Sequence, residues 1–183
     1  KCDDLRVTLS SGRSRLSIGT QDASSFPTLN SPEGETKIDV AALRRAIDLT
    51  RYAMATGKGR EILQGLCLRS DGGGQVLANA CDGFALSRFP IVGWTGDVDM
   101  LLPAASVAAL DKCLPDEGEV TVATNESAAL FSYDGGSARV TLVDLQFPDL
   151  ERLIPRLDDV FTAVFDASAL LAAVSRLELA GDG

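Results

Sequence analysis

IDVAALRRAIDLTRYA, at residues 38–53, contains the end of a strand followed by a helix. Asp39 is a residue type that caps helix N-termini, because its carboxylate accepts hydrogen bonds from the first free backbone N–H groups. The following stretch, Val40–Ala53, has apolar residues at helical spacing, with Leu43 and Ala46 on one face. This pattern predicts an amphipathic helix directly after a short strand.

Two later segments have the same form. Leu102-Pro103 leads into a predicted helix at Ala104–Cys113, and Phe165-Asp166 leads into one at Ala167–Leu177. The capping positions lie 64 and 63 residues apart. The positions four and seven residues past each cap are apolar in every copy: Leu43, Val107 and Leu170, then Ala46, Leu110 and Ala173. We predict a repeated strand–helix–strands unit, with chance similarity between alanine-rich helices as the alternative.

Turn residues flanked by nearly alternating segments predict three hairpins. They pair Leu5–Ser10 with Ser14–Gly19, Gly65–Ser70 with Gln75–Cys81, and Ala128–Tyr133 with Ser137–Val143. The aperiodic, Pro- and Ser-containing stretch Thr20–Glu35 is typical of a linker. Because a helix with a narrow apolar stripe needs a sheet to pack on, the sequence predicts an α+β fold. We expect its helices on one face of antiparallel sheets.

The composition disfavours several classes of function. The 183 residues are 45% hydrophobic and 23% charged, and the apolar runs are too short to span a membrane. Histidine is absent, and Cys2, Cys67, Cys81 and Cys113 have no paired spacing, which disfavours structural zinc and histidine-based acid–base catalysis. Cys67 and Cys81 are expected to be buried, reduced thiols in a cytoplasmic protein. We expect no metal and no cofactor.

Charge is unevenly distributed along the chain. Residues 41–60 hold five basic side chains and the single acid Asp48, a local net charge of +4. Because the whole chain has a net charge of −9, the remaining residues have a net charge of −13. This separation favours one cationic face on an acidic protein. A solvated helix face without a partner is the alternative interpretation.

Three motifs indicate a family. They are SGRSRLSI at residues 11–18 followed by Ser25-Phe26-Pro27, ACDGFAL at 80–86, and LQFPDLERLIP at 145–155. The second resembles the A-T-D-G-H-R-L segment, and the third the F-P-D-Y-x-x-[VL]-[LI]-P segment, of the bacterial DNA polymerase III beta subunits, the sliding clamps. The resemblance covers essentially the whole chain.

The resemblance implies a DNA-clamp fold. Residues 1–30 would be the end of clamp domain 1, 31–153 a complete domain 2 and 154–183 the start of domain 3. The implied function is a non-catalytic processivity factor that encircles duplex DNA without sequence preference. Implied partners are DNA polymerase III, clamp loader subunits and other proteins with a clamp-binding motif, and the full-length protein is expected to form a head-to-tail homodimer away from membranes.

In clamps of this family the helices line the central hole, which implies DNA contacts for Arg44, Arg51, Lys58 and Arg60. Such contacts go to phosphates and need no base edges. Arg45 ranks lower because it points to another side of its helix. The second helix offers only Lys112, and Ala104 and Ala105 stand where the family tends to be basic.

The family also has a pocket for short apolar peptide motifs between domains 2 and 3. Residue by residue, the resemblance assigns to it Leu63, Cys81, Gly83, Phe84, Ala85, Leu86, Pro148, Arg152 and Leu153. Their types suit an apolar groove with a small polar rim. Because Phe84 and Ala85 replace the usual His and Arg, we expect a more apolar, less cationic pocket.

Two other functions remain open. A clamp-like interaction or regulatory module would bind partners without encircling DNA. A hydrolytic enzyme using Asp82 beside Gly83 is remote, because the sequence has no histidine and no phosphate-binding loop.

Overall fold

The computed structural model describes residues 2–3, 6–25, 32, 36–57, 59–154 and 163–181. Of the residues and segments singled out above, Leu5, Phe26, Pro27, Lys58 and Pro155, and residues 26–31 and 33–35 of the predicted linker, lie outside this described part. The chain divides into two compact units, one ending at Phe147 and one beginning at Pro148.

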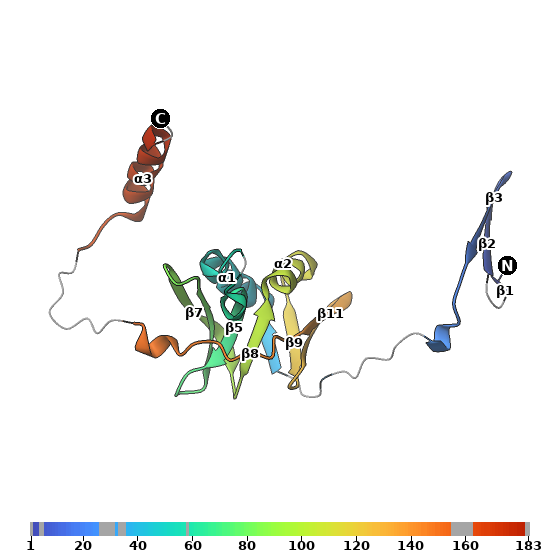
Figure 1. Cartoon of the computed structure of the whole chain (residues 1–183), viewed down its shortest axis with the longest axis horizontal. Coiled ribbons are helices and arrows are strands. Elements are labelled where there is room, and N and C mark those ends of the chain that lie inside the picture. The colour runs from blue at the N-terminus through green and yellow to red at the C-terminus, as the bar shows by residue number, and fades with distance from the viewer. Residues whose placement is uncertain are drawn as a thin grey trace. The chain divides into compact units, whose positions relative to one another are not determined.

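Residues 36–147, termed here the two-sheet domain, contain two four-stranded antiparallel sheets (Figure 1). One sheet has the order β7 (Leu86–Thr95), β6 (Gln75–Cys81), β5 (Gly65–Ser70), β8 (Asp99–Pro103). The other has the order β11 (Gly136–Thr141), β10 (Ala128–Tyr133), β9 (Glu119–Thr124), β4 (Thr36–Asp39). Edge strands β4 and β7 contact each other, as do β8 and β11, so the sheets meet along both edges.

The first two copies of the repeat predicted from the sequence are present, with an exchange of strands, whereas residues 163–166 before the third helix form no strand. The first half has the order β4, a helix, β5, β6 and β7, and the second half has β8, a helix, β9, β10 and β11. Strand β4 pairs with β9 of the second half, and β8 pairs with β5 of the first. Each half therefore contributes its first strand to the sheet of the other.

Two helices pack on the sheets and lie near each other (Figure 1). Helix α1 spans Val40–Thr50, and its N-cap Asp39 accepts a 3.0 Å hydrogen bond from the N–H of Ala42, as predicted. Helix α2 spans Ala104–Cys113, the predicted range. The predicted apolar face is buried in both helices: Leu43 and Ala46 in α1, and Val107 and Leu110 in α2. The α+β prediction, with helices on one face of antiparallel sheets, is confirmed for this domain.

One core joins both sheets and both helices. Its largest fully buried side chains include Trp94 of β7, Phe131 of β10 and Leu43 of α1. Cys67 and Cys81 are buried free thiols, as expected, and burial raises the pKa of the Cys67 thiol to about 12. Packing across both sheets makes the domain a single folding unit.

Two strands of the domain were not predicted. Strand β7 contains Pro90 and the positive-φ Gly93, which interrupt its alternation. Proline is tolerated there because β7 is an edge strand that pairs only with β6. Strand β9 alternates clearly and could have been identified from Val120 and Val122, which are both buried.

The N-terminal segment forms a small sheet of its own. Strands β1 (Cys2–Asp3), β2 (Arg6–Ser11) and β3 (Ser14–Gly19) are antiparallel, which confirms the first predicted hairpin, and the 3-10 turn η1 (Ala23–Ser25) follows. Leu9, Leu16 and Ile18 are exposed on it.

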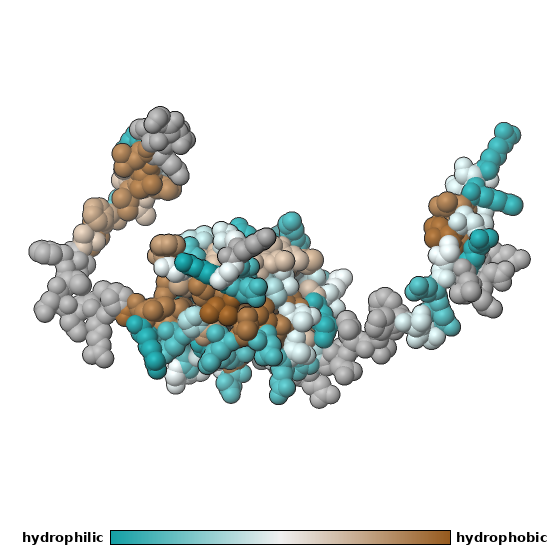
Figure 2. Space-filling model, viewed as in Figure 1, coloured by the Kyte–Doolittle hydropathy of each residue, from teal (hydrophilic) through white to brown (hydrophobic). Residues whose placement is uncertain are grey.

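The second unit contains the short 3-10 helix η4 (Leu150–Arg152) and helix α3 (Ala167–Gly181). Asp166 accepts a 2.8 Å hydrogen bond from the N–H of Ala169, the predicted cap, and α3 runs past the predicted end at Leu177. Its apolar residues are exposed, as the brown surface of α3 in Figure 2 shows: Leu170, Leu171, Val174 and Leu177. The described residues of this unit contain no strand.

Candidate functional site

Helices α1 and α2 are joined by an arginine–aspartate network. Arg44 of α1 donates from Nη2 to the backbone carbonyl of Asp111 at 2.7 Å and from Nη1 to Oδ1 of Asp116 at 2.7 Å. Arg51 donates from Nη1 to Oδ2 of Asp111 at 2.9 Å and forms a 3.0 Å ion pair with Asp48. Two of the side chains predicted to bind DNA are thus engaged with carboxylates.

The remaining basic side chains of these helices are arranged differently. The guanidinium of Arg45 lies 6.0 Å from the ring centroid of Phe89 on β7, and Arg45 lines a surface hollow together with Arg44, Asp48 and Asp116. Lys112 is exposed on the last turn of α2. Lys58 lies outside the described residues.

The loop Asp82–Ala85, termed here the docking loop, connects β6 to β7 and contains three of the predicted pocket residues. The carboxylate Oδ1 of Asp82 accepts hydrogen bonds from the N–H groups of Phe84 at 2.7 Å and Ala85 at 2.6 Å. The Asp82 N–H in turn donates to the carbonyl of Ala85. These bonds hold the loop in a tight turn, which places the side chain of Phe84 in solvent, 92% exposed.

The charge of Asp82 stabilises this turn. Hydrogen bonds from the N–H groups of Ala85 and Phe84 lower the pKa of the Asp82 carboxyl from its ordinary value of 3.8. Because the pKa of Asp82 is lower in the folded protein than in the unfolded chain, its ionised carboxylate contributes to folding stability above the ordinary pKa. That contribution is lost as the pH falls through the lowered pKa of the folded protein.

We predict that the backbone amide resonances of Phe84 and Ala85 will titrate with a midpoint below 3.8, followed by NMR between about pH 6 and pH 2. The variant Asp82→Asn is the control, because it lacks the titrating group. A midpoint at or above the ordinary value would contradict the hydrogen bonding described here.

Arg60 packs over the docking loop. Its Nη1 donates to the carbonyl of Asp82, and its guanidinium lies 5.5 Å from the ring centroid of Phe84. Gly83 has a φ of +93°, and a Cβ at this position would lie 2.6 Å from Nη1 of Arg60. The left-handed backbone explains glycine here, because the Arg60 guanidinium is the end of a flexible side chain and could move aside. Sequence reasoning grouped Arg60 with the DNA-contacting residues and missed this packing.

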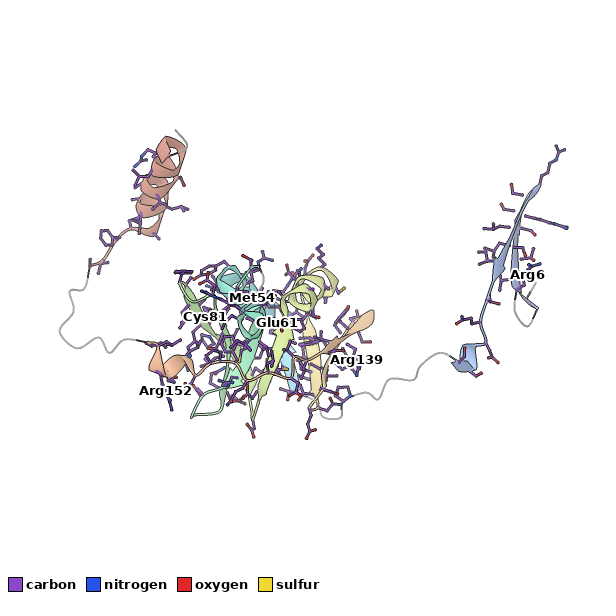
Figure 3. All side chains as sticks on the ribbon, viewed as in Figure 1. Arg6, Met54, Glu61, Cys81, Arg139 and Arg152 are labelled. Atoms are coloured by element: carbon purple, nitrogen blue, oxygen red, sulfur yellow. The ribbon has the colours of Figure 1, made fainter. Side chains whose placement is uncertain are left out.

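Beside Arg60 the surface has a hollow of about 630 Å³, lined by Gly59, Arg60, Glu61, Ile62, Leu63 and Leu145. Leu63 ends the 3-10 helix η3 (Glu61–Leu63) and is half-buried, whereas Ile62 and Leu145 are exposed. Cys81, at the end of β6, is buried, and its Sγ accepts a 3.4 Å hydrogen bond from the N–H of Gly83. Figure 3 shows Glu61 and Cys81 in the two-sheet domain. An apolar hollow with a few polar groups is the ordinary composition of a ligand groove.

Three other predicted pocket residues belong to the second unit. Pro148 is half-buried, Leu153 is exposed, and Arg152 extends from η4, where it pairs with Asp149 at 3.3 Å (Figure 3). Leu86, the ninth predicted residue, is half-buried at the start of β7.

Within the described ranges, no three Cys, Asp or Glu side chains are arranged to hold a metal ion, and none of the helices there is long and apolar enough to cross a membrane.

Comparison with known proteins identifies the family. Residues 37–149 match the model of the DNA polymerase III beta subunit, central domain. The chain belongs to this family. The match covers nearly all of the two-sheet domain, so the strand exchange, the arginine–aspartate network and the docking loop all lie within the part that defines family membership.

Relatives extend the family likeness beyond the central domain. The beta sliding clamp of Caulobacter vibrioides is 32% identical over 96% of this chain, and that of Pseudomonas aeruginosa is 30% identical over 96%. A crystal structure of the Pseudomonas aeruginosa DNA polymerase sliding clamp with ligand superposes with a TM-score of 0.76 at 28% identity, over 87% of this chain and 45% of that one. The beta subunit of Streptococcus pyogenes DNA polymerase shares the fold, with a TM-score of 0.78 at 23% identity over 98% of this chain and 49% of that one. The chain spans about half the length of these family members: 49% of both curated relatives.

Proposed function

We propose that this chain is a segment of a DNA sliding clamp, a non-catalytic processivity factor that encircles duplex DNA and tethers replication proteins. The family match over residues 37–149 carries the proposal. In this assignment residues 1–30 end clamp domain 1, residues 31–153 form domain 2 and residues 154–183 begin domain 3. The full-length protein would close a ring as a head-to-tail homodimer.

The proposed mechanism is topological. A closed ring cannot leave a duplex by simple dissociation, so weak phosphate contacts without base recognition suffice and permit sliding. Arg44, Arg51 and Lys58 are proposed to supply these contacts from the helix-lined side of the ring. Arg60 remains a predicted DNA contact, although its packing on Phe84 favours a role beside the docking loop.

Partner docking is the second part of the proposal. We infer that DNA polymerase III, clamp loader subunits and other partners insert an apolar motif beside the docking loop, against Leu63, Gly83 and Phe84. The exposed ring of Phe84 and the adjacent hollow support this. The inclusion of Cys81, Ala85, Leu86, Pro148, Arg152 and Leu153 rests on the resemblance.

The decisive experiment uses DNA topology. The full-length protein, assembled on nicked circular DNA with a clamp loader, is expected to co-elute with the circle during gel filtration at moderate salt. Cutting the circle once should release it, because a ring runs off a free end. Equal retention on circular and linear DNA would contradict encirclement.

A second candidate is a clamp-like interaction or regulatory module that does not encircle DNA. The carboxylates that engage Arg44 and Arg51 favour it, because they reduce the positive charge available to phosphates. Peptide binding without any difference between circular and linear DNA would favour this module over the ring.

A further inference from the structure

The network between α1 and α2 concentrates carboxylates around two guanidinium groups. The side chain of Asp111 is 24% exposed and pairs with both Arg44, at 3.8 Å, and Arg51, at 2.9 Å. Asp116 is 97% exposed and takes the opposite side of the Arg44 guanidinium. With Asp48, three carboxylates surround two guanidinium groups, so the network carries a formal charge of −1.

The directions of the donors matter as much as the charge. Arg44 points Nη1 at Asp116 and Nη2 at the carbonyl of Asp111, with a longer contact from Nη1 to the carbonyl of Pro115 at 3.5 Å. A phosphate needs donors of this kind, because the guanidinium fork matches carboxylate and phosphate oxygens alike. Phosphates that approach Arg44 or Arg51 therefore compete with carboxylates that already have good geometry.

We propose that Asp111 and Asp116 compete with DNA phosphates for Arg44 and Arg51 and thereby weaken the grip of this domain on the duplex. The inference rests on the proposed function and deepens it, since it names the residues that set how strongly this domain binds DNA. Asp111 is the principal competitor because it engages both arginines. Asp116 acts on Arg44 alone.

The test measures binding of the full-length protein to a fluorescent 30-base-pair linear duplex by anisotropy, over a series of salt concentrations. Asp111→Asn keeps the size and an acceptor oxygen of the side chain but removes its charge. It is expected to tighten binding about 3- to 10-fold at low salt and to steepen the slope of log K against log salt by up to about 1, since a fully freed arginine adds roughly 0.9 and Asp116 and Asp48 still pair with Arg44 and Arg51 in this variant. Asp116→Asn, on a fully solvated side chain, should give a smaller change of the same sign.

Two controls separate competition from simple loss of charge. Asp97→Asn makes the same change in net charge but precedes β8, at the end of that strand remote from α2. It should leave the slope unchanged. Adding Arg44→Gln and Arg51→Gln to Asp111→Asn should abolish the gain, because the freed donors are then absent.

The outcomes also separate this inference from the proposed function. If Asp111→Asn and Asp116→Asn both match Asp97→Asn in affinity and slope, the competition is refuted even though the unaltered protein stays on nicked circles. If Asp111→Asn unfolds the protein, as judged by circular dichroism, Asp116→Asn alone decides. Failure of the unaltered protein to stay on the circle would instead refute encirclement.

Discussion

Replacement of Phe131 by alanine is expected to lower the free energy of unfolding by about 3–5 kcal/mol. Phe131 lies on β10, between β9 and β11, and is completely buried in the core shared by both sheets. Removal of the ring loses its transfer free energy and leaves a cavity that the surrounding strands cannot fill. Urea unfolding of the 183-residue chain measures the change through Trp94, the single tryptophan, which is buried in the same core.

Phe84→Ala is the matched control, because the same atoms are removed from a side chain that is 92% exposed. Its expected effect on unfolding is within about 0.5 kcal/mol. Equal destabilisation by the two variants would contradict either the burial of Phe131 or the exposure of Phe84.

Leu63→Ala is expected to weaken binding of a peptide carrying the family's clamp-binding motif by about 10- to 30-fold, roughly 1.4–2 kcal/mol. Leu63 lines the hollow next to Arg60, and its truncation removes apolar contact area from that wall. Phe84→Ala should weaken binding as well, since the docking loop places this ring in solvent. Titration of the full-length protein by calorimetry measures both.

Val92→Ala supplies the control for docking. Val92 is an exposed apolar residue of β7, and the hollow does not include it, so peptide affinity should be unchanged. Arg152→Ala tests the residues assigned from the resemblance alone. If both Leu63→Ala and Arg152→Ala bind the peptide with unchanged affinity, the proposed pocket assignment is refuted.

The elements that local sequence signals define were predicted well. Helix α2 has the predicted bounds, and the hairpin turn at residues 71–74 lies between the predicted strands, whereas Gly136 of the third predicted turn belongs to β11, which ends at Thr141 and not at the predicted Val143. Helix α1 ends at Thr50, before the predicted Ala53, because the chain tightens there into the 3-10 turn η2 (Arg51–Ala53). The hydroxyl of Thr50 donates to the carbonyl of Ala46 at that end.

The contacts that decide the chemistry of the site were not predictable from sequence. Arg44 and Asp111 are 67 residues apart in the chain, and Arg60 and Asp82 are 22 apart. Charge counting found the basic segment at residues 41–60 and its one acid, Asp48, which pairs locally with Arg51, but only the tertiary fold brings Asp111 and Asp116 to Arg44. Tertiary contacts between distant segments carry no local periodic signal, so their partners could not be assigned.

The exchange of β4 and β8 between the two halves makes those halves mutually dependent. Neither half keeps a complete sheet if the other is deleted, since each would lose an edge strand and expose the backbone groups of its neighbour. A gene encoding only one half should therefore give a product that either aggregates or pairs with a second copy of itself. Such self-pairing would restore the missing strand by symmetry, which is the arrangement expected of an ancestral homodimer that later became fused into one polypeptide.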